Sequence, residues 1–193
     1  MKFGVPIHVR SSFTERDGTW VGAETRELES VVVAGVASDK NEVKLTIRSL
    51  PDEPGISAKI FKQLAQANVC VDMIIQNVSL QGTTDLTFTA GKGDVAQARQ
   101  LAISLAHQVG AGEVVVDSAV VKVSIVGLGM RSHAGVAARM FELLAHEGIN
   151  IQAISTSEIK VSCLIHERYA ELAVRTLHDG FGLAEQAPAR NGL

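Results

Sequence analysis

The chain contains two copies of one pattern, and this internal repeat constrains its fold more than any other feature. When Gly55 is aligned with Gly135, an offset of 135 − 55 = 80, six of the 21 positions from 55 to 75 carry the same residue type. The shared residues are Gly55, Ala58, Phe61, Leu64, Ala65 and Ile74. Unrelated segments would share about one or two positions over this length, so the repeat predicts two similar domains in tandem.

Each copy shows the same order of strand and helix signals. The expected strands are 43–47, 69–78, 84–89 and 113–117 in the first copy, and 121–126, 149–156 and 160–165 in the second. The expected helices begin near Ile56 and near Asp94, a suitable N-cap, in the first copy, and cover 136–144 and 167–177 in the second. Their apolar residues recur at helical spacing. The strand–helix–strand–strand–helix–strand order predicts an α+β, ferredoxin-like (βαββαβ) fold for each copy.

The second copy lacks its fourth strand, whereas an unassigned apolar segment, residues 30–36, precedes the first copy. If that segment completes the second sheet, the first domain (40–118) is inserted into the second (30–38 plus 119–182). The alternative is an extra edge strand on the first domain. The inserted arrangement is favoured because it completes both sheets. Residues 183–193 are polar and are expected to be a disordered tail.

Residues 1–29 differ from both repeats. Residues 5–12 look like one short strand with no local partner, and 13–29 are polar and rich in turn residues. Because a lone strand is not stable in water, this segment reads as the end of a missing domain, a linker, or a piece that docks on a partner.

Composition excludes several classes of protein. The net charge is −3 and aromatic residues make up 4%, which disfavours nucleic-acid binding and an RNA-recognition sheet. Cys70 and Cys163 form no disulfide framework or metal quartet, and no segment is apolar enough to be a signal peptide or membrane span, so a cytoplasmic setting is expected. The segment 127–132 (GLGMRS) lacks the context of a dinucleotide site. No motif indicates catalysis, a metal or a cofactor.

One strand-to-helix turn is used twice, as 52–57 (DEPGIS) and as 132–137 (SHAGVA). Asp52 and Ser132 are expected to cap the helices that follow. Free N–H groups at a helix start also suit a small carboxylate, and Asp52 could hold an ammonium group beside them. The two features together favour the binding of an amino acid.

Five strings then carry a family resemblance: 52–55 (DEPG), 71–79 (VDMIIQNVS), 83–89 (TTDLTFT), 127–133 (GLGMRSH) and 150–159 (NIQAISTSEI). In this order they resemble the regulatory region of aspartokinases, which is built from two ACT domains. The resemblance covers about 30–180, and residues 5–20 resemble the end of the aspartokinase catalytic domain. The nucleotide- and aspartate-binding parts of that kinase are absent, so the resemblance implies a noncatalytic regulatory subunit or a truncated chain.

The resemblance also implies two effector pockets. The first would combine the turn residues Asp52, Gly55, Ile56 and Ser57 with Gln76, and with Asn150 and Ile151 of the opposite repeat. The second would pair Val136 and Ala137 with Cys70, Val71 and Asp72, with Ser155, Thr156, Ser157 and Glu158 nearby. Two residues depart from the family pattern, Cys70 in place of asparagine and Ala134 in place of proline, and both fall in the second pocket.

The function implied is feedback regulation of aspartate kinase, the ATP-dependent phosphorylation of aspartate, by threonine, lysine or both. The implied partners are a catalytic subunit or domain of that kinase and a second copy of the chain, in a homodimer. The alternative is a free-standing ACT-type amino-acid-binding module that serves another biosynthetic enzyme. Residues 5–20 favour the first interpretation, because they make sense only beside a kinase domain.

Overall fold

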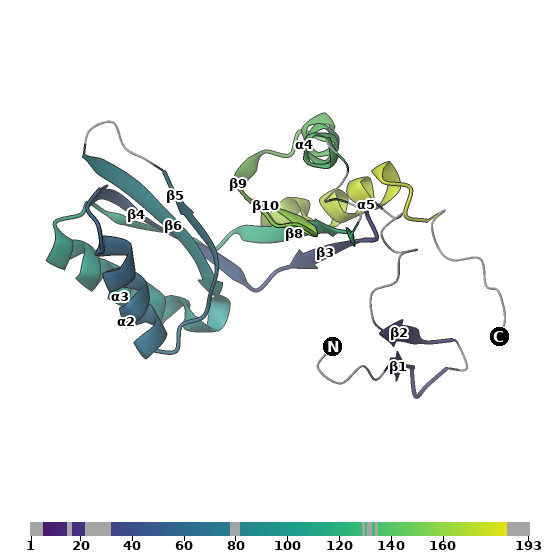
Figure 1. Ribbon diagram of the computed structural model, residues 1–193, viewed down its shortest axis with the longest axis horizontal. Helices are drawn as coiled ribbons and strands as arrows, with labels where there is room; N and C mark the ends of the chain where they lie inside the picture. Colours follow the sequence, from purple (N-terminus) through teal and green to yellow (C-terminus); the bar gives the residue numbers. More distant parts are fainter. Residues whose placement is uncertain are drawn as a thin grey trace.

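The structure, a computed structural model, describes residues 6–14, 17–21, 32–77, 82–128, 130, 133 and 135–184 of the 193 residues. Two four-stranded antiparallel sheets, each with two α-helices, make up most of it (Figure 1). The predicted pair of α+β ferredoxin-like domains is therefore confirmed. No helix in these residues is both long enough and apolar enough to cross a membrane.

The first domain has the predicted βαββαβ order. Its elements are β4 (Glu42–Pro51), α2 (Ile56–Gln66), β5 (Val71–Gln76), β6 (Thr83–Gly91), α3 (Val95–Val109) and β7 (Val114–Asp117), with a short 3-10 helix, η1 (Lys92–Asp94), before α3. The strands lie in the order β5-β6-β4-β7. The sheet and both helices share one core, in which Phe88 is fully buried and meets Phe61 edge to face, with ring centroids 5.9 Å apart.

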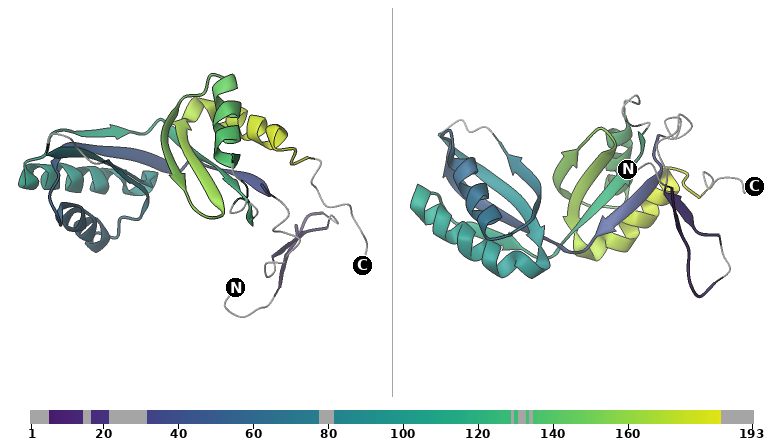
Figure 2. Two further views of the ribbon diagram at one scale, coloured as in Figure 1. Left: turned by 45° about the horizontal axis from the view of Figure 1, so that its top comes forward. Right: turned by 60° about the horizontal axis from the view of Figure 1, so that its bottom comes forward.

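The second domain is completed by a strand from before the first. Its elements are β3 (Gly35–Asp39), β8 (Val120–Val126), α4 (Val136–His146), β9 (Ile151–Thr156), β10 (Lys160–His166) and α5 (Ala170–Gly180), with the 3-10 helix η3 (Glu167–Tyr169) before α5. The strands lie in the order β3-β8-β10-β9. The inserted arrangement is thus confirmed, and the alternative of an extra edge strand on the first domain is wrong. Both views in Figure 2 show the chain entering the second sheet before it builds the first domain.

The completing strand lies a few residues later than predicted. Residues 30–31 are outside the described part, and the regular pairing runs from Gly35 to Asp39. The apolar residues before it still pack inward, since Val33 is only 2% exposed. Gly127 has a structural role here, because a Cβ at that position would lie 2.2 Å from the carbonyl oxygen of Val32. The glycine of the 127–132 segment thus allows two backbones to approach closely.

The helix starts differ from the predicted caps. The residues that precede α2 and α4 are Gly55 and Gly135, with φ of 93° and 92°, and no side chain caps either helix. These left-handed conformations strain any residue with a Cβ, which accounts for glycine at both places. Asp52 therefore does not cap α2, and Ser132 lies outside the described residues. Asp94 precedes α3 as predicted, but its side chain makes no capping hydrogen bond.

The amino-terminal segment also departs from its prediction. The strand expected over 5–12 is β1 (Ile7–Val9), and it pairs locally with β2 (Thr19–Val21) in an antiparallel hairpin. The partner strand lies inside the stretch read as polar turns. The prediction that this strand has no local partner is therefore wrong.

Removing residues 1–39 should disrupt the second domain far more than the first. The truncation deletes β3 and Val33, which leaves β8 as an unpaired edge and opens the second core. Amide hydrogen exchange checks this: we expect faster exchange in 119–182 than in 42–117. Faster exchange confined to 42–117 would contradict the insertion.

The two cysteines should differ strongly in reactivity. Cys163 lies in the second core with no exposed surface, and burial raises the pKa of its thiol to about 12, whereas Cys70 is exposed. The thiolate is the reactive form of cysteine. A disulfide reagent at pH 8 should therefore modify Cys70 at once, and the rate at Cys163 should be lower by a factor of about a hundred or more. Mass spectrometry of the labelled peptides gives the readout, with the urea-unfolded chain as the control in which both react. Equal rates in the folded chain would contradict the burial of Cys163.

Candidate functional site

The two domains meet through the sheet faces that their own helices leave uncovered. On β4, Val43 and Leu45 point into the first core, so Lys44 between them faces the other way. Lys122 takes the same position on β8. An apolar cluster from both domains lies at this junction, formed by Met73, Val120 and Leu164 with Ile75 and Ala153 packed against them.

Lys122 is the charged centre of this domain junction. Its Nζ donates hydrogen bonds of 2.6 Å to Glu42 Oε1 and to Asp72 Oδ2, and lies 3.6 Å from Asp39 Oδ2. The Lys122 and Glu42 side chains are only 12% and 5% exposed. Burial alone would lower the pKa of Lys122, but the hydrogen bonds to Asp72 and Glu42 outweigh it and raise the pKa well above its ordinary value. Lys122 therefore stays charged and links its own domain to Glu42 and Asp72 of the other.

Lys44 makes the corresponding contact in the opposite direction. The two lysines are equivalent in the repeat, at an offset of 122 − 44 = 78, and Gln152 is equivalent to Asp72, at 152 − 72 = 80. Lys44 Nζ donates to Gln152 Oε1 of the second domain and lies 3.6 Å from Asp117 Oδ2 of its own. Each domain thus sends one lysine across the junction to the other, in a pseudo-symmetric exchange.

The turn before α2 brings part of the first predicted pocket together. Ser57 Oγ, in the first turn of α2, donates a hydrogen bond of 2.7 Å to Gln76 Oε1 at the end of β5. The N–H of Ile56 reaches Glu53 O at 3.4 Å, whereas those of Ser57 and Ala58 have no acceptor among the described residues. These two N–H groups lie at the positive end of the helix dipole and can receive an anion.

Asp52 lies just before this turn and is exposed. Its N–H donates to Gly82 O at 3.0 Å, which fixes the backbone, while its carboxylate has no partner within the part of the chain that the structure describes. The carboxylate is thus available to a cation beside the free N–H groups. Asp52 and the N–H groups of Ser57 and Ala58 thus lie within a few residues of one another along the chain.

Asn150 and Ile151 lie in the other domain. Ile151 begins β9 and pairs with Ile165, and Asn150 just before it is exposed. Among the described residues, no hydrogen bond or ion pair joins them to Asp52, Ser57 or the turn between. One copy of the chain therefore supplies two separate halves of the first predicted pocket.

The second predicted pocket is divided in the same way. Cys70 and Val71 lie at the start of β5, and Asp72 is bonded to Lys122. The residues expected opposite them belong to the second domain: Val136 and Ala137 start α4, Ser155 and Thr156 end β9, and Ser157 and Glu158 form the following turn. Ser157 closes that turn by donating its N–H to Lys160 O at 2.7 Å.

A cavity of about 370 Å³ opens beside Lys122, and its acidic lining was not predicted from the sequence. Its walls contain Asp39, Asn41, Glu42, Cys70, Val71, Asp72, Ala90, Gly91 and Asp94. The signal that could have found it is the repetition of a lysine at the equivalent positions 44 and 122, each between two apolar residues of a strand. Within the described residues, no three acidic, histidine or cysteine side chains converge as metal ligands.

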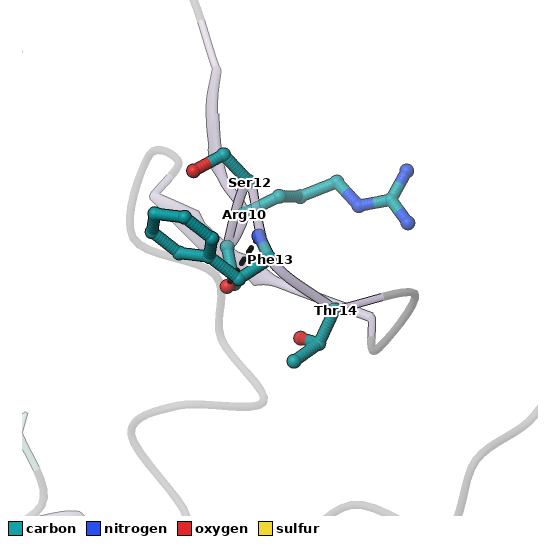
Figure 3. A pocket seen from close by; sticks show the side chains of 5 residues that line it. Arg10, Ser12, Phe13 and Thr14 are labelled. Atoms are coloured by element: carbon teal, nitrogen blue, oxygen red, sulfur yellow. Dashed lines mark hydrogen bonds between the residues drawn. The ribbon is translucent and has the colours of Figure 1, made fainter.

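Another hollow lies in the amino-terminal segment and holds no comparable chemistry. Arg10, Ser11, Ser12, Phe13 and Thr14 line it (Figure 3), and all five are neighbours in the sequence. Phe13 is 94% exposed and its N–H donates to Ser11 Oγ at 3.1 Å. The hollow is therefore the inside of one local bend, outside both domains.

Comparison with known proteins then decides the family. The family model described as "ACT domain" matches residues 48–102 and 123–181. A chain from the crystal structure of aspartokinase alpha and beta subunits is 53% identical, with a TM-score of 0.74 over 78% of this chain and 99% of that one. The chain belongs to the family of aspartokinase regulatory regions built from ACT domains. The ligand-free regulatory subunit of aspartate kinase from Thermus thermophilus is similar too, at 38% identity and a TM-score of 0.74 over the same shares.

Longer relatives extend the match over the whole of this aspartokinase regulatory region. The aspartate kinase of Pseudomonas fluorescens is 53% identical over 192 residues, which is 99% of this chain and 46% of that protein. The chain thus spans about half the length of the curated relatives it matches. E. coli aspartokinase III, solved in complex with lysine and aspartate, is 26% identical, with a TM-score of 0.68 over 93% of this chain and 39% of that one.

The two junction lysines should differ in their contribution to stability. Lys122→Met leaves the buried Glu42 carboxylate without a cation, which should cost about 3 kcal/mol in the free energy of unfolding. Lys44→Met removes contacts to Gln152 and to the partly exposed Asp117, and should cost ~1 kcal/mol. Urea unfolding followed by circular dichroism measures both.

A double variant is the control for this prediction. In Lys122→Met/Glu42→Gln the buried charge is gone, so part of the lost stability should return. Equal losses for the two lysine variants, or no recovery in the double variant, would show that the junction does not depend on the Lys122 charge.

Proposed function

We propose that this regulatory region binds threonine, lysine or both, and thereby exerts feedback inhibition on aspartate phosphorylation by an aspartate kinase catalytic subunit or domain. The observation that carries the proposal is the turn before α2. Unpaired N–H groups of Ser57 and Ala58, the Ser57–Gln76 pair and the free Asp52 carboxylate adjoin one another there. An amino acid carries an anion and a cation on one carbon, and this turn offers a group for each.

The carboxylate of the effector would bind at the start of α2. Gly55 turns the chain with φ of 93°, so the following N–H groups are not covered by a capping side chain. Backbone N–H groups at a helix start combine hydrogen bonding with the helix dipole, which suits a carboxylate. The N–H groups of Ser57 and Ala58 would form the anion-binding half of the pocket, beside Gly55 and Ile56, which shape the turn before them.

The ammonium or side-chain hydroxyl of the effector would bind to Asp52 and Gln76. Gln76 Oε1 already accepts from Ser57 Oγ, so it is held in position next to the helix start. A carbonyl oxygen has a second lone pair that a ligand N–H or O–H can use. Asp52 adds the negative charge that an ammonium group needs.

A second copy of the chain would complete this pocket. Asn150 and Ile151 were expected opposite the turn, yet they belong to the other domain of the same chain. The edge strands β5 and β9 also expose apolar side chains, with Ile74 at 54% and Ile154 at 43%. Exposed apolar residues on strand edges favour association, so we propose a homodimer in which β9 of one copy faces the α2 turn of the other.

The second, pseudo-symmetric pocket would be weaker or differ in its ligand. The positions equivalent to Ser57 and Gln76 are Ala137 and Thr156, at 57 + 80 = 137 and 76 + 80 = 156. The hydroxyl–amide pair of the first pocket is thus replaced, and Cys70 offers no amide where Asn150 does in the other repeat. An effector there would rely on Val136, Ala137, Val71 and the Ser155–Glu158 turn.

The kinase assignment rests on the breadth of the match. The Pseudomonas fluorescens aspartate kinase aligns with 99% of this chain, including the segment before the two domains. A free-standing module for another enzyme would not need that segment to resemble a kinase. The lysine complex of E. coli aspartokinase III supports lysine as one effector class.

Asp52→Ala should weaken effector binding with little effect on stability. Asp52 caps no helix, so its loss should change the free energy of unfolding by less than ~0.5 kcal/mol. Loss of a charged hydrogen bond to the ammonium group should cost about 1.5–3 kcal/mol in binding, roughly tenfold to a hundredfold in Kd. Calorimetric titration with threonine and with lysine, beside thermal melts, measures both quantities.

Two further variants sharpen this test. Ser57→Tyr should block the same pocket with its ring and remove the bond to Gln76, whereas Glu142→Ala, a 70% exposed acid on α4, should bind like the parent. In the assembled kinase, Asp52→Ala and Ser57→Tyr should each give normal activity that resists feedback. If Asp52→Ala binds both amino acids as the parent does, the turn is structural and the pocket assignment is wrong.

A further inference from the structure

A β-bulge interrupts β4 just before the chain enters the α2 turn. β4 pairs regularly with β6 as far as Ile47, and the register shifts before the pairing resumes at Leu50. Arg48 and Ser49 therefore lie opposite a single residue of β6, Asp85. Such a two-against-one arrangement bends a strand and changes the direction of the side chains that follow it.

Ser49 is the strained residue of this β-bulge. Its φ is 50°, and Asn68 is the one other non-glycine residue with a positive φ in the described part of the chain. Asparagine tolerates this left-handed conformation, whereas serine adopts it at a cost in free energy. The Ser49 N–H donates a hydrogen bond of 2.9 Å to Asp85 Oδ1. The Asp85 side chain thus holds Ser49 in a conformation that the serine backbone disfavours.

The β-bulge decides which residues of β4 enter the core. Val43, Leu45 and Ile47 alternate into the first core, and Leu50 is the next residue buried there. Side chains of a regular strand alternate between its two faces, so an uninterrupted β4 would bury Ser49 and expose Leu50. The β-bulge therefore sets the register in which β4 reaches the α2 turn.

The strands on either side hold the β-bulge by different means. Toward β7, the Arg48 N–H donates to Glu113 O at 3.0 Å, and the Arg48 carbonyl oxygen accepts from the Gly112 N–H at 2.8 Å. A Cβ at Gly112 would lie 3.0 Å from that carbonyl oxygen, so glycine allows the close approach. Toward β6, the support of Ser49 comes from the side chain of Asp85. This side-chain contact can be removed by substitution, whereas the backbone contacts cannot.

The neighbour of Asp85 on β6 supports the other side of the proposed pocket. Thr84 is 5% exposed, and its Oγ1 donates to the carbonyl oxygen of Asn77, the residue after Gln76. Asp85, through the β-bulge, supports the segment of β4 that leads to Asp52. Two adjacent residues of β6 thus hold the two segments that carry the Gln76 and Asp52 side chains.

The second repeat lacks this support. The residue equivalent to Ser49 is Gly127, at 49 + 78 = 127, and its N–H donates to the backbone carbonyl oxygen of Ile159 at 2.9 Å. The strands β6 and β10 match at an offset of 75 in their pairing with β4 and β8, so Lys160 is equivalent to Asp85. The pairing of β8 with β10 shows no register shift. Of the two turns, the one with a carboxylate support is the turn that we propose to bind the effector.

We propose that Asp85 is a positioning residue for the amino-acid pocket at the α2 turn. It acts through Ser49 and not on the effector: it holds the β-bulge, and the β-bulge fixes where β4 delivers Asp52 and Gly55. The inference rests on the proposed function and names a residue that controls affinity from outside the pocket. A pocket whose parts are held in place before the ligand arrives loses less conformational freedom on binding. Loss of the Asp85 support should therefore weaken binding.

Calorimetric titration of the full chain with threonine and with lysine tests this role. Asp85→Ala removes the acceptor and should raise the Kd of the amino acid that the parent binds about tenfold, the effect of roughly one charged hydrogen bond. Asp85→Asn keeps Oδ1 as an acceptor, so its Kd should stay within about twofold of the parent value. Glu113→Ala is the matched control. It removes an exposed carboxylate that accepts from the Arg48 side chain at 2.8 Å on the β7 side of the β-bulge, and it should bind like the parent.

A rescue variant separates positioning from direct contact with the effector. Glycine adopts a φ of 50° without strain, so Ser49→Gly should bind like the parent, and Ser49→Gly/Asp85→Ala should regain most of the affinity that Asp85→Ala loses. A carboxylate that contacted the effector itself could not be replaced in this way. Parent-like binding by Asp85→Ala, or no rescue in the double variant, would overturn the proposal even if the melting temperatures follow the strain. If the parent binds neither amino acid, the pocket assignment fails, and the role of Asp85 fails with it.

Discussion

The arrangement of the two domains depends on a reciprocal exchange of lysines across their junction. Lys122 reaches Glu42 and Asp72 of the first domain, and Lys44 reaches Gln152 of the second. Taking charges out of water is costly, so such pairs add little net stability, but any other alignment of the sheets would leave a buried charge unpaired. The small apolar cluster at the junction holds the two sheets together, and the lysines fix the orientation of one domain relative to the other.

The repeat made most of the fold predictable, because two copies with the same strand and helix order must form similar sheets. The topology followed from the missing fourth strand, since an incomplete sheet would leave β8 as an open edge. Local conformation was less predictable. Gly55 occupies the position expected of a capping side chain because its left-handed backbone, not a hydrogen bond, turns the chain into α2. The β1–β2 pair was missed because three-residue strands carry almost no periodic signal.

The sequence could predict contacts between residues of the same repeat. It could not predict contacts that form only where the two domains meet. The Ser57–Gln76 bond joins the helix start to the strand that follows the same helix, a contact built into one ferredoxin-like unit. Glu42 and Asp94 belong to the acidic cavity through strand pairing and domain contact, which have no short sequence signature. The equivalent positions of Lys44 and Lys122 are the one trace that the junction leaves in the sequence.

Strand β5 connects the α2 turn, where we propose that the effector binds, with the junction between the domains. Gln76, at its end, contacts the first turn of α2, whereas Asp72 and Met73, near its start, contact the second domain through Lys122 and the apolar cluster. The whole strand is only six residues long, and it pairs with β6 at both of its ends. If an amino acid binds at the turn as we propose and repositions Gln76, the displacement would therefore also reach the Asp72–Lys122 bond. A local binding event could in this way change how the domains are held together, which is the differential contact that allosteric coupling requires.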